Sequence, residues 1–343
     1  NIFATGMHLE KKFGYTVNEI IKSFPKTKIF KYKNLSSFNN FQDKVLAKTI
    51  YGFSKYINKI KPDLIIIHGD RVETLAAAIV GSLNNYLVGH IEGGERTGTI
   101  DEHIRHSVSK LSHLHFVSNL DAQKRLIKMG ERKDRIFKFG RPDIDILKSK
   151  DLPNFFDVKK RYNIPFNEYI ILLYHPVTTE SQIQIRNNSK EIFRAISKCK
   201  KNFVLIYPNN DPGHNTIIQN LHKKLRNKKN VKILRSMRFE FFLSLLKSSS
   251  IILGNSSSGI IEAPFYGVPT INLGTRQKNR SQVKTIFNSN FEHKSILKLI
   301  NILHKKKFKK NQSWGTGNSS KKICNLLQKK YIWKTSIQKQ IQY

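Results

Sequence analysis

Short apolar runs that alternate with helical patterns are the feature that most constrains the fold of this 343-residue chain. KPDLIIIHGD (61–70) is an apolar run that ends in polar residues, RVETLAAAIVGSLNN (71–85) has helical spacing, and YLVGHIEGG (86–94) is the next apolar run. Apolar strands that alternate with helices are typical of a parallel sheet covered by helices on both faces. In such sheets the chemistry lies beyond the carboxyl ends of the strands, where HGD and EGG stand.

The same alternation occurs twice along the chain, which predicts two domains. A polar connection, KSKDLPNFFD (148–157), separates the two sets of strands. We therefore expect an α/β architecture of two Rossmann-like domains that face a central cleft: an N-terminal domain over 1–150, a C-terminal domain over 151–330 and a tail over 331–343. The helical spacing of 321–332 predicts that this segment packs back on the first domain. In the second set we expect strands within 168–180, 202–213, 231–234, 250–259 and 268–274, and helices around 186–200, 215–228, 239–248 and 258–266.

The composition argues against several other classes of protein. Lys and Arg outnumber Asp and Glu by 61 to 24, a formal charge of +37, but the excess is mostly Lys spread over the whole chain. The densest patch, HKKKFKK (304–310), comes with no zinc-finger spacing or RNP-type aromatic motif, so we interpret the charge as solvated surface and expect no specific nucleic-acid partner. No apolar run reaches about 18 residues, so no membrane span is expected. Cys199 and Cys324 lie far apart, which favours two reduced thiols in a cytoplasmic protein.

A candidate phosphate site lies in the second set of strands. GNSSSGIIEAPFYG (254–267) follows an apolar strand and is predicted to start a helix, whose free N–H groups can receive an anion. Ser256 and Ser257 add hydroxyl donors, Glu262 can accept hydrogen bonds from a ribose, and Arg276 of GTRQ ends the next strand as a fork for a diphosphate. A Ser-rich helix cap explains the first motif alone equally well, but the combination favours a nucleotide-diphosphate site.

The segment HIEGGERTGTIDEHIRH (90–106) is rich in carboxylates although the chain as a whole is poor in them. Together with HGDR (68–71), it brings five carboxylates within reach of one cleft: Asp70, Glu92, Glu95, Asp101 and Glu102. A metal site is one interpretation, but no HExxH-like pattern is present and neighbouring arginines repel a cation. Asp101 alone can also be a helix cap. Carboxylates beside arginines and an anion site suit acid–base chemistry on a sugar nucleotide, in which separate carboxylates act as base and acid.

These motifs, with TGMHLEKKFG, KLSHLHFVS and YHPVTTE, resemble those of the hydrolysing UDP-N-acetylglucosamine 2-epimerases, the bacterial sialic- and legionaminic-acid type and the epimerase half of the bifunctional animal enzyme. The resemblance runs from residue 1 to about 330. It implies a GT-B-like fold, a UDP-sugar substrate, a homodimer, and neither a metal nor a nicotinamide cofactor. HGDR with EGGE and GTIDExIRH favours the hydrolysing branch over the non-hydrolysing one.

The resemblance also implies site residues. It makes Asp70, Glu92 and Asp101 the acid–base carboxylates, without saying which of them takes the C2 proton, and it places Arg105 in support of that cluster. It brings His175 to the substrate from the second domain. It puts His68 and Arg71 beside the sugar diphosphate, and it assigns UDP binding to Ser256, Ser257, Glu262 and Arg276.

Two departures from the family pattern leave alternatives open. The chain begins on what corresponds to the family's second strand, so we expect the first strand, loop and helix of the N-terminal domain, about 40 residues, to be absent. Arg141 of GRPD (140–143) stands where a small residue is expected, and we expect its charge to alter substrate choice. Besides UDP-GlcNAc hydrolysis to ManNAc for nonulosonic acid synthesis, the alternatives are an epimerase acting on a UDP-2,4-diacetamido-2,4,6-trideoxy sugar, a catalytically impaired nucleotide-sugar binder, and a nucleic-acid-binding protein.

Overall fold

The computed structural model describes residues 1–11, 14–35, 41–96, 100–209, 211–278, 280–281 and 283–342. The chain divides into two compact units. Unit 1 holds Asn1–Glu95, Ile100–Phe139 and the C-terminal residues from Lys321 onward, whereas unit 2 holds Gly140–Ser320. This division differs from the expected ranges 1–150, 151–330 and 331–343 at both ends of the second domain.

The physical reason for the difference is the packing of two helices. α6 (Pro142–Leu147) buries Ile144 and Leu147 in a core of unit 2, so the segment before the predicted linker already belongs to that unit. α13 (Ser319–Leu327) buries Ile323 and Leu326 against strands of unit 1. The expected return of 321–332 to the first domain is therefore found.

Unit 1 contains two parallel sheets. β1 (Ile2–Thr5) pairs with β2 (Ile29–Tyr32), and four further strands pair in the order β3-β4-β5-β6. All three pairings in the larger sheet are parallel. The strands of this sheet are β3 (Leu64–His68), β4 (Leu87–Ile91), β5 (Leu114–Val117) and β6 (Ile136–Lys138).

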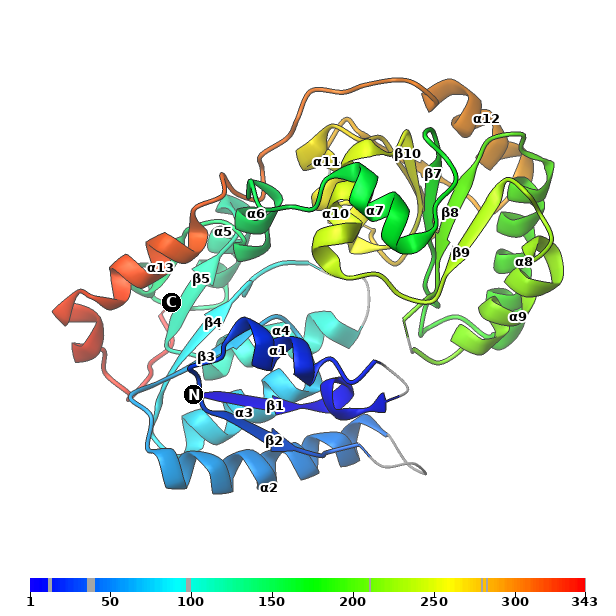
Figure 1. Ribbon diagram of the computed structural model, residues 1–343. Coiled ribbons are helices and arrows are strands. Elements are labelled where there is room, and N and C mark those ends of the chain that lie inside the picture. The colour runs from blue at the N-terminus through cyan, green and yellow to red at the C-terminus, as the bar shows by residue number, and fades with distance from the viewer. Residues whose placement is uncertain are drawn as a thin grey trace. The chain divides into compact units, whose positions relative to one another are not determined.

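Helices of unit 1 connect consecutive parallel strands, as their spacing predicts. α3 (Val72–Leu83) is apolar on most sides and packs on α2 (Gln42–Ile60) and α4 (Ile100–Leu111). Their joint core includes Phe53, Ile65, Ile67 and Val88. The remaining helices complete the unit (Figure 1): η1 (Gly6–Leu9), α1 (Val17–Ser23), α5 (Leu120–Lys128), η3 (Lys133–Arg135) and η5 (Lys330–Lys334).

Unit 2 is a six-stranded parallel sheet in the order β12-β11-β10-β7-β8-β9. The chain fills the β7-β8-β9 half first and then the β10-β11-β12 half, so the strand order reverses between β7 and β10. In doubly wound sheets this switch point is where ligands bind. The strands are β7 (Ile170–Leu173), β8 (Phe203–Ile206), β9 (Val231–Leu234), β10 (Ile251–Gly254), β11 (Thr270–Leu273) and β12 (Ile286–Ser289).

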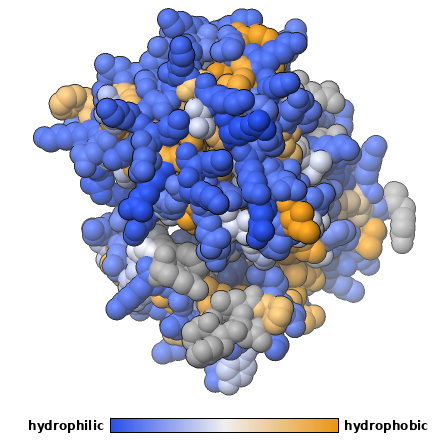
Figure 2. All heavy atoms as spheres, turned by 90° about the vertical axis from the view of Figure 1, so that its right-hand side faces the viewer, coloured by the Kyte–Doolittle hydropathy of each residue, from blue (hydrophilic) through white to orange (hydrophobic). Residues whose placement is uncertain are grey.

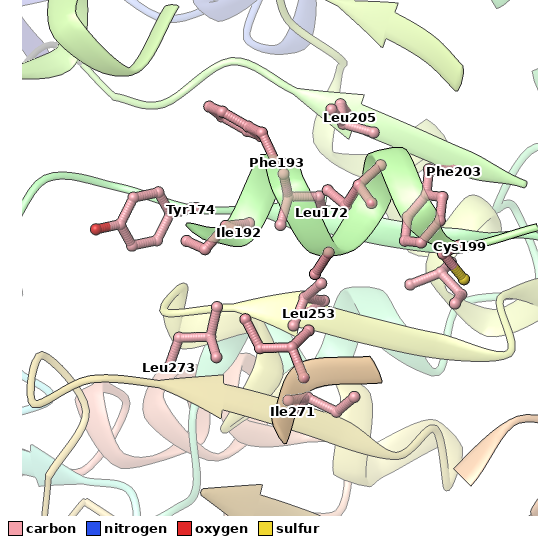
Figure 3. Close-up of a cluster of buried hydrophobic side chains, with 14 of the residues drawn as sticks. Leu172, Tyr174, Ile192, Phe193, Cys199, Phe203, Leu205, Leu253, Ile271 and Leu273 are labelled. Atoms are coloured by element: carbon pink, nitrogen blue, oxygen red, sulfur yellow. The ribbon is translucent and has the colours of Figure 1, made fainter. Parts of the chain in front are cut away.

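Both faces of this sheet are buried. Along β7, Ile170 and Leu172 belong to one core and Ile171 and Leu173 to the other, as the two-residue period of a strand requires. α8 (Gln182–Lys198), α9 (His214–Leu225) and α12 (His293–Leu303) cover the first face, whose core is shown in Figure 3. α7 (Phe155–Tyr162), α10 (Phe239–Ser248) and α11 (Glu262–Tyr266) cover the second face (Figure 1).

One face of the protein is strongly polar. Hydrophilic residues cover most of the face drawn in Figure 2, with hydrophobic residues scattered among them. This distribution fits a Lys excess that is spread along the sequence rather than concentrated in one stretch. Among the helices that the structure describes, none combines the length and the apolar character that crossing a membrane requires.

Candidate active site

In unit 1, the predicted site residues follow the carboxyl ends of two neighbouring strands and enter the next helix. Asp70 lies between β3 and α3, and Glu92 directly follows β4. Arg105 lies on α4, the helix after β4. Because β3 and β4 are parallel neighbours, their ends meet at one edge of the sheet.

Arg105 joins the two carboxylate segments. Its side chain is only 3% exposed, and its guanidinium is ion-paired with the Asp70 carboxylate. The same guanidinium donates through Nη1 to the backbone oxygen of Glu92 at 2.8 Å and lies 3.9 Å from the Glu92 carboxylate. A buried guanidinium needs compensating partners, and these contacts supply them. The structure therefore brings Arg105 into contact with Asp70 and Glu92, two of the three carboxylates that it was predicted to support.

Glu92 occupies an unusual backbone conformation. Its φ is +68°, in the left-handed region that non-glycine residues rarely adopt. Its carboxylate, 6% exposed, accepts a 2.6 Å hydrogen bond from Nε2 of His68. Backbone strain of this kind persists where the surroundings over-determine it and clusters at functional sites. Glu92 is therefore held from three sides: by its backbone, by Arg105 and by His68.

Asp101 and Arg71 are placed differently from that trio. Asp101 is the second residue of α4, within the first turn, and so is not the residue that caps the helix. It stands four residues before Arg105, which puts both on the same face of α4. Arg71 is exposed at the residue preceding α3.

In unit 2, the switch point is built around Asn255, which the sequence analysis did not select. The side chain of this fully buried residue accepts from the His175 backbone N–H at 2.7 Å and donates to the His175 carbonyl at 2.8 Å. Gly254 precedes it with φ +134°, and a Cβ there would lie 2.1 Å from the Leu173 oxygen. Only glycine allows β10 to end so close to β7. A two-way amide bridge between strands 80 residues apart leaves no pattern in the sequence.

His175 is thereby fixed at the end of β7. Its Nδ1 accepts a hydrogen bond from the Asn209 backbone N–H at 2.9 Å. Burial, and secondarily Arg276, lower the pKa of His175 to about 3. The imidazole is therefore neutral near pH 7, and because Nδ1 accepts, the proton lies on Nε2, where it is a hydrogen-bond donor.

Arg276 comes to the same place from the loop after β11. Its guanidinium lies 3.4 Å from the Asn255 carbonyl and 4.0 Å from the Asp211 carboxylate. Gln277 also donates to the Asn255 carbonyl, at 3.0 Å. The structure thus brings Arg276 and His175 together around Asn255.

The serine motif differs from its prediction. No continuous helix covers 258–266: a 3-10 turn, η4 (Ser257–Gly259), is followed by the five-residue α11. Ser256 caps the turn by accepting from the Ser258 N–H at 3.2 Å, and Ser257 opens it. The expected helix is wrong because Pro264 has no N–H and is tolerated only in a first helical turn, so α11 begins late. The two serines contribute a tight turn rather than a long helix terminus.

Glu262 is a buried carboxyl group in α11. Its Oε2 atom has no hydrogen-bond partner among the described residues. Burial and the neighbouring Asp143 carboxylate raise the pKa of Glu262 to about 7, against the opposing effect of Arg141. A buried polar atom without a partner is uncommon and is one sign of a ligand-binding group.

Arg141 has a structural place that the sequence did not predict. It is buried, its guanidinium forms hydrogen bonds of 2.8–3.1 Å with the Asp143 carboxylate, and it lies over the ring of Trp314. Its backbone N–H also donates to the Trp314 carbonyl at 2.8 Å. The Arg141 charge is thus paired inside unit 2, which argues against the expectation that it acts as an added charge on the substrate.

No cluster of three or more His, Cys, Asp or Glu side chains suited to a metal ion occurs in the part of the chain that the structure describes. The chemistry that the two sets of residues offer is that of carboxylates, a neutral imidazole and guanidinium groups.

Comparisons with known proteins identify the family of this chain. The family model described as UDP-N-acetylglucosamine 2-epimerase matches residues 1–328. A UDP-N-acetylglucosamine 2-epimerase of Neisseria meningitidis serogroup B is 40% identical over 99% of this chain and 90% of its own length. A hydrolysing GDP/UDP-N,N'-diacetylbacillosamine 2-epimerase of Campylobacter jejuni is 36% identical over 90% of this chain and 81% of its own. A hydrolysing UDP-N,N'-diacetylbacillosamine 2-epimerase of Legionella pneumophila is 33% identical over 95% and 87%.

Solved structures share the fold. The UDP-GlcNAc 2-epimerase from Neisseria meningitidis, bound to UDP-GlcNAc, superposes with a TM-score of 0.77 at 22% identity, over 91% of this chain and 88% of that one. The Methanocaldococcus jannaschii enzyme, in complex with UDP-GlcNAc and UDP, gives a TM-score of 0.74 at 22% identity, over 95% and 98%. The α/β architecture is therefore the GT-B-like one of two Rossmann-like domains. On the family match and these identities, the chain belongs to the UDP-N-acetylglucosamine 2-epimerase family.

Proposed function

We propose that this chain is a hydrolysing UDP-N-acetylglucosamine 2-epimerase that converts UDP-GlcNAc and water into UDP and free ManNAc. In the first half, a carboxylate takes the proton from C2, the C1–O bond breaks, and UDP leaves with the bonding electrons, which gives 2-acetamidoglucal. In the second half, water adds at C1 and a proton returns to C2 on the opposite face. Each half needs both a base and an acid near the same two carbon atoms.

The observation that carries the proposal is the contact of the Arg105 guanidinium with both Asp70 and Glu92. Proton transfer on opposite faces of one carbon needs carboxyl groups in different environments, so that one accepts while another donates. Asp70 is ion-paired with Arg105, whereas Glu92 is hydrogen-bonded by His68. Asp101 lies on the same face of α4 as Arg105 and is the third carboxylate of the proposed set. His68 and Arg71 are proposed to contact the sugar diphosphate.

Unit 2 supports UDP binding in this proposal. Arg276 provides positive charge for the diphosphate, and neutral His175 offers an N–H donor beside it. The unpartnered Oε2 of Glu262 suits a ribose hydroxyl group. Ser256 and Ser257, in the turn at η4, are proposed to bind UDP as well. A nucleoside diphosphate leaving group is stabilised by such positive and hydrogen-bonding groups.

The hydrolysing outcome and its substrate are the finer part of the proposal. HGDR with EGGE, and the relatives of 33% and 36% identity named as hydrolysing enzymes, support release of a free sugar. The relative of 40% identity favours UDP-GlcNAc over UDP-2,4-diacetamido-2,4,6-trideoxy sugars, which remain the second candidate substrates. A relative of 32% identity named polysialic acid biosynthesis protein P7 supports use of the product in nonulosonic (sialic-type) acid synthesis.

The test is an NMR time course of the purified protein with UDP-GlcNAc in D₂O. We expect UDP and free ManNAc deuterated at C2, because the returning proton comes from solvent. Asp70→Asn is the control and should lower the rate by a factor of about 100 or more, as loss of a general acid or base does. Formation of UDP-ManNAc without free sugar would refute hydrolysis. Binding without turnover of UDP-GlcNAc, together with turnover of the diacetamido substrate, would replace the first substrate by the second.

A further inference from the structure

His90 is a fully buried histidine to which the reaction proposed above assigns no role. It lies on β4, two residues before Glu92, and its ring is 0% exposed. Nε2 lies 2.9 Å from the carbonyl oxygen of Gly69, and Nδ1 lies 3.0 Å from the hydroxyl oxygen of Ser109. One partner belongs to the HGD loop after β3 and the other to α4.

The hydrogen-bond directions follow from the partners. A carbonyl oxygen only accepts, so Nε2 carries the proton and donates it to Gly69. Nδ1 is then the acceptor and receives the Ser109 hydroxyl. Burial lowers the pKa of His90 to about 3, although the Gly69 hydrogen bond opposes this, so the ring stays neutral at working pH. Both ring nitrogens of His90 are thus engaged by partners within the protein.

The two contacts of His90 lie next to the residues of the proposed carboxylate cluster. Gly69 directly precedes Asp70, and Ser109 lies one helical turn after Arg105, the ion-pair partner of Asp70. The third segment of the cluster is equally close: a Cβ on Gly93 would lie 2.8 Å from the Ser109 hydroxyl and 2.9 Å from His90 Nδ1. The imidazole therefore hydrogen-bonds to the loop of Asp70 and to the helix of Arg105, and it lies close to Gly93, the residue after Glu92.

We propose that His90 is a positioning residue, which holds the Gly69–Asp70 loop against α4 through its Nε2–H and thereby sets the geometry of Asp70 with Arg105. The proposal rests on the proposed function only for its kinetic consequence. The contact itself is a property of the fold. A displacement of a reacting group by about 1 Å is enough to cost on the order of 100-fold in rate.

Two amide substitutions separate this role from simple core packing. In His90→Gln, the side-chain amide reaches the position of Nε2 and can still donate to the Gly69 carbonyl. In His90→Asn, the shorter amide reaches only the position of Nδ1, keeps Ser109 as its partner and leaves the Gly69 carbonyl without a donor. Both variants lose the ring, so they share the packing defect. His115 is the matched control, because it is the buried cross-strand partner of His90 but its Nε2 contacts Glu131 instead of the carboxylate cluster.

The experiment compares the wild-type protein with His90→Gln, His90→Asn and His115→Asn in three readouts: kcat and KM for UDP-GlcNAc, the thermal midpoint, and hydrogen exchange of a peptide covering residues 68–75. For His90→Asn we expect kcat to fall by about 30- to 100-fold, with KM changed by less than about 3-fold, and exchange at 69–71 to accelerate by about 10-fold or more. His90→Gln should keep kcat within about 5-fold of wild type, and His115→Asn should lose stability but not kcat.

Equal kcat in the Asn and Gln variants, or unchanged exchange of the 68–75 peptide in His90→Asn, would overturn the positioning role. A loss of kcat in His115→Asn that matches its loss of stability would overturn it too, because packing would then explain both. Failure of the wild-type protein to turn over UDP-GlcNAc would instead refute the proposed function. In that case the hydrogen-exchange comparison still decides whether His90 holds the loop.

Discussion

Among single residues, Glu262 gives the clearest prediction of how stability depends on pH. Its pKa is raised to about 7 in the folded protein, so the folded state keeps its proton where an unfolded chain, with the ordinary value of 4.5, has lost it. A raised folded pKa contributes stability that is present below pH about 4.5 and lost as the pH rises to about 7. Glu262→Gln removes this proton equilibrium and leaves a neutral group of the same size.

We therefore expect the free energy of unfolding of Glu262→Gln, relative to wild type, to increase as the pH rises from 4.5 to 7, by at most about 3 kcal/mol. Urea denaturation at half-unit pH steps measures the difference. The control is Glu240→Gln, on α10 of the same unit, whose carboxylate is exposed and pairs with Arg238. A pH-independent difference for Glu262→Gln would show that burial does not perturb this carboxyl group.

At the scale of elements, the C-terminal segment from Lys321 onward is anchored to the rest of unit 1. The Lys339 ammonium group donates to three backbone oxygens at the end of α4, those of Ser109, Lys110 and Ser112, at 2.7–3.1 Å. It also pairs at 2.6 Å with the buried Glu131 carboxylate. Although burial alone would raise it, contacts with His115 and Lys339 hold the pKa of Glu131 well below its usual range.

Lys339→Met should destabilise unit 1 by about 2–3 kcal/mol, because it removes one donor from each of three carbonyls and from a buried carboxylate. Urea denaturation, followed by a probe in unit 1, gives the value. Lys330→Met, on an exposed residue of the same segment, is the control and should change stability by less than about 0.5 kcal/mol. Adding Glu131→Gln to Lys339→Met should recover part of the loss. Additive effects of the two substitutions would mean that the ion pair is not coupled.

At the scale of the whole molecule, the net charge of +37 sets a dependence on salt. Like charges repel in the compact state, and raising the ionic strength from 0.01 to 0.15 M shortens the Debye length from about 30 to about 8 Å. We expect the thermal midpoint to rise over this range. Partly acetylated protein, with fewer lysine charges, should show a smaller rise, and a midpoint that falls with salt in both samples would contradict this account.

The sequence predicted the elements whose evidence is local. β3, β4 and the strands of unit 2 up to β11 are apolar runs between turn signals, and the carboxylate and arginine positions follow directly from their ends. β2 (IFKY) and β12 (IFNS) were not predicted, because four mixed residues carry too little periodicity to distinguish a strand from a loop.

Some contacts within the site could not be predicted from the sequence either. The contact of Arg105 with the Glu92 carbonyl depends on a positive φ at Glu92, and the Asn255 bridge depends on the register of β7 with β10. Neither quantity is encoded in the spacing of residues along the chain. The motifs therefore identify which side chains take part, whereas the strand register decides which of them touch.

The membership of residues from Lys321 onward in unit 1 has a consequence for synthesis. An apolar surface of β4 and β5, formed by Leu87, Leu114 and Phe116, is covered by Ile323, Leu326 and Ile332. This surface therefore stays exposed while all of unit 2 is being translated. At about 5–20 residues per second, that interval lasts on the order of ten seconds or more on the ribosome. The main part of unit 2, Gly140–Ser320, is one continuous stretch and can finish folding during that time. The half of the protein that is made first is thus the half that is completed last.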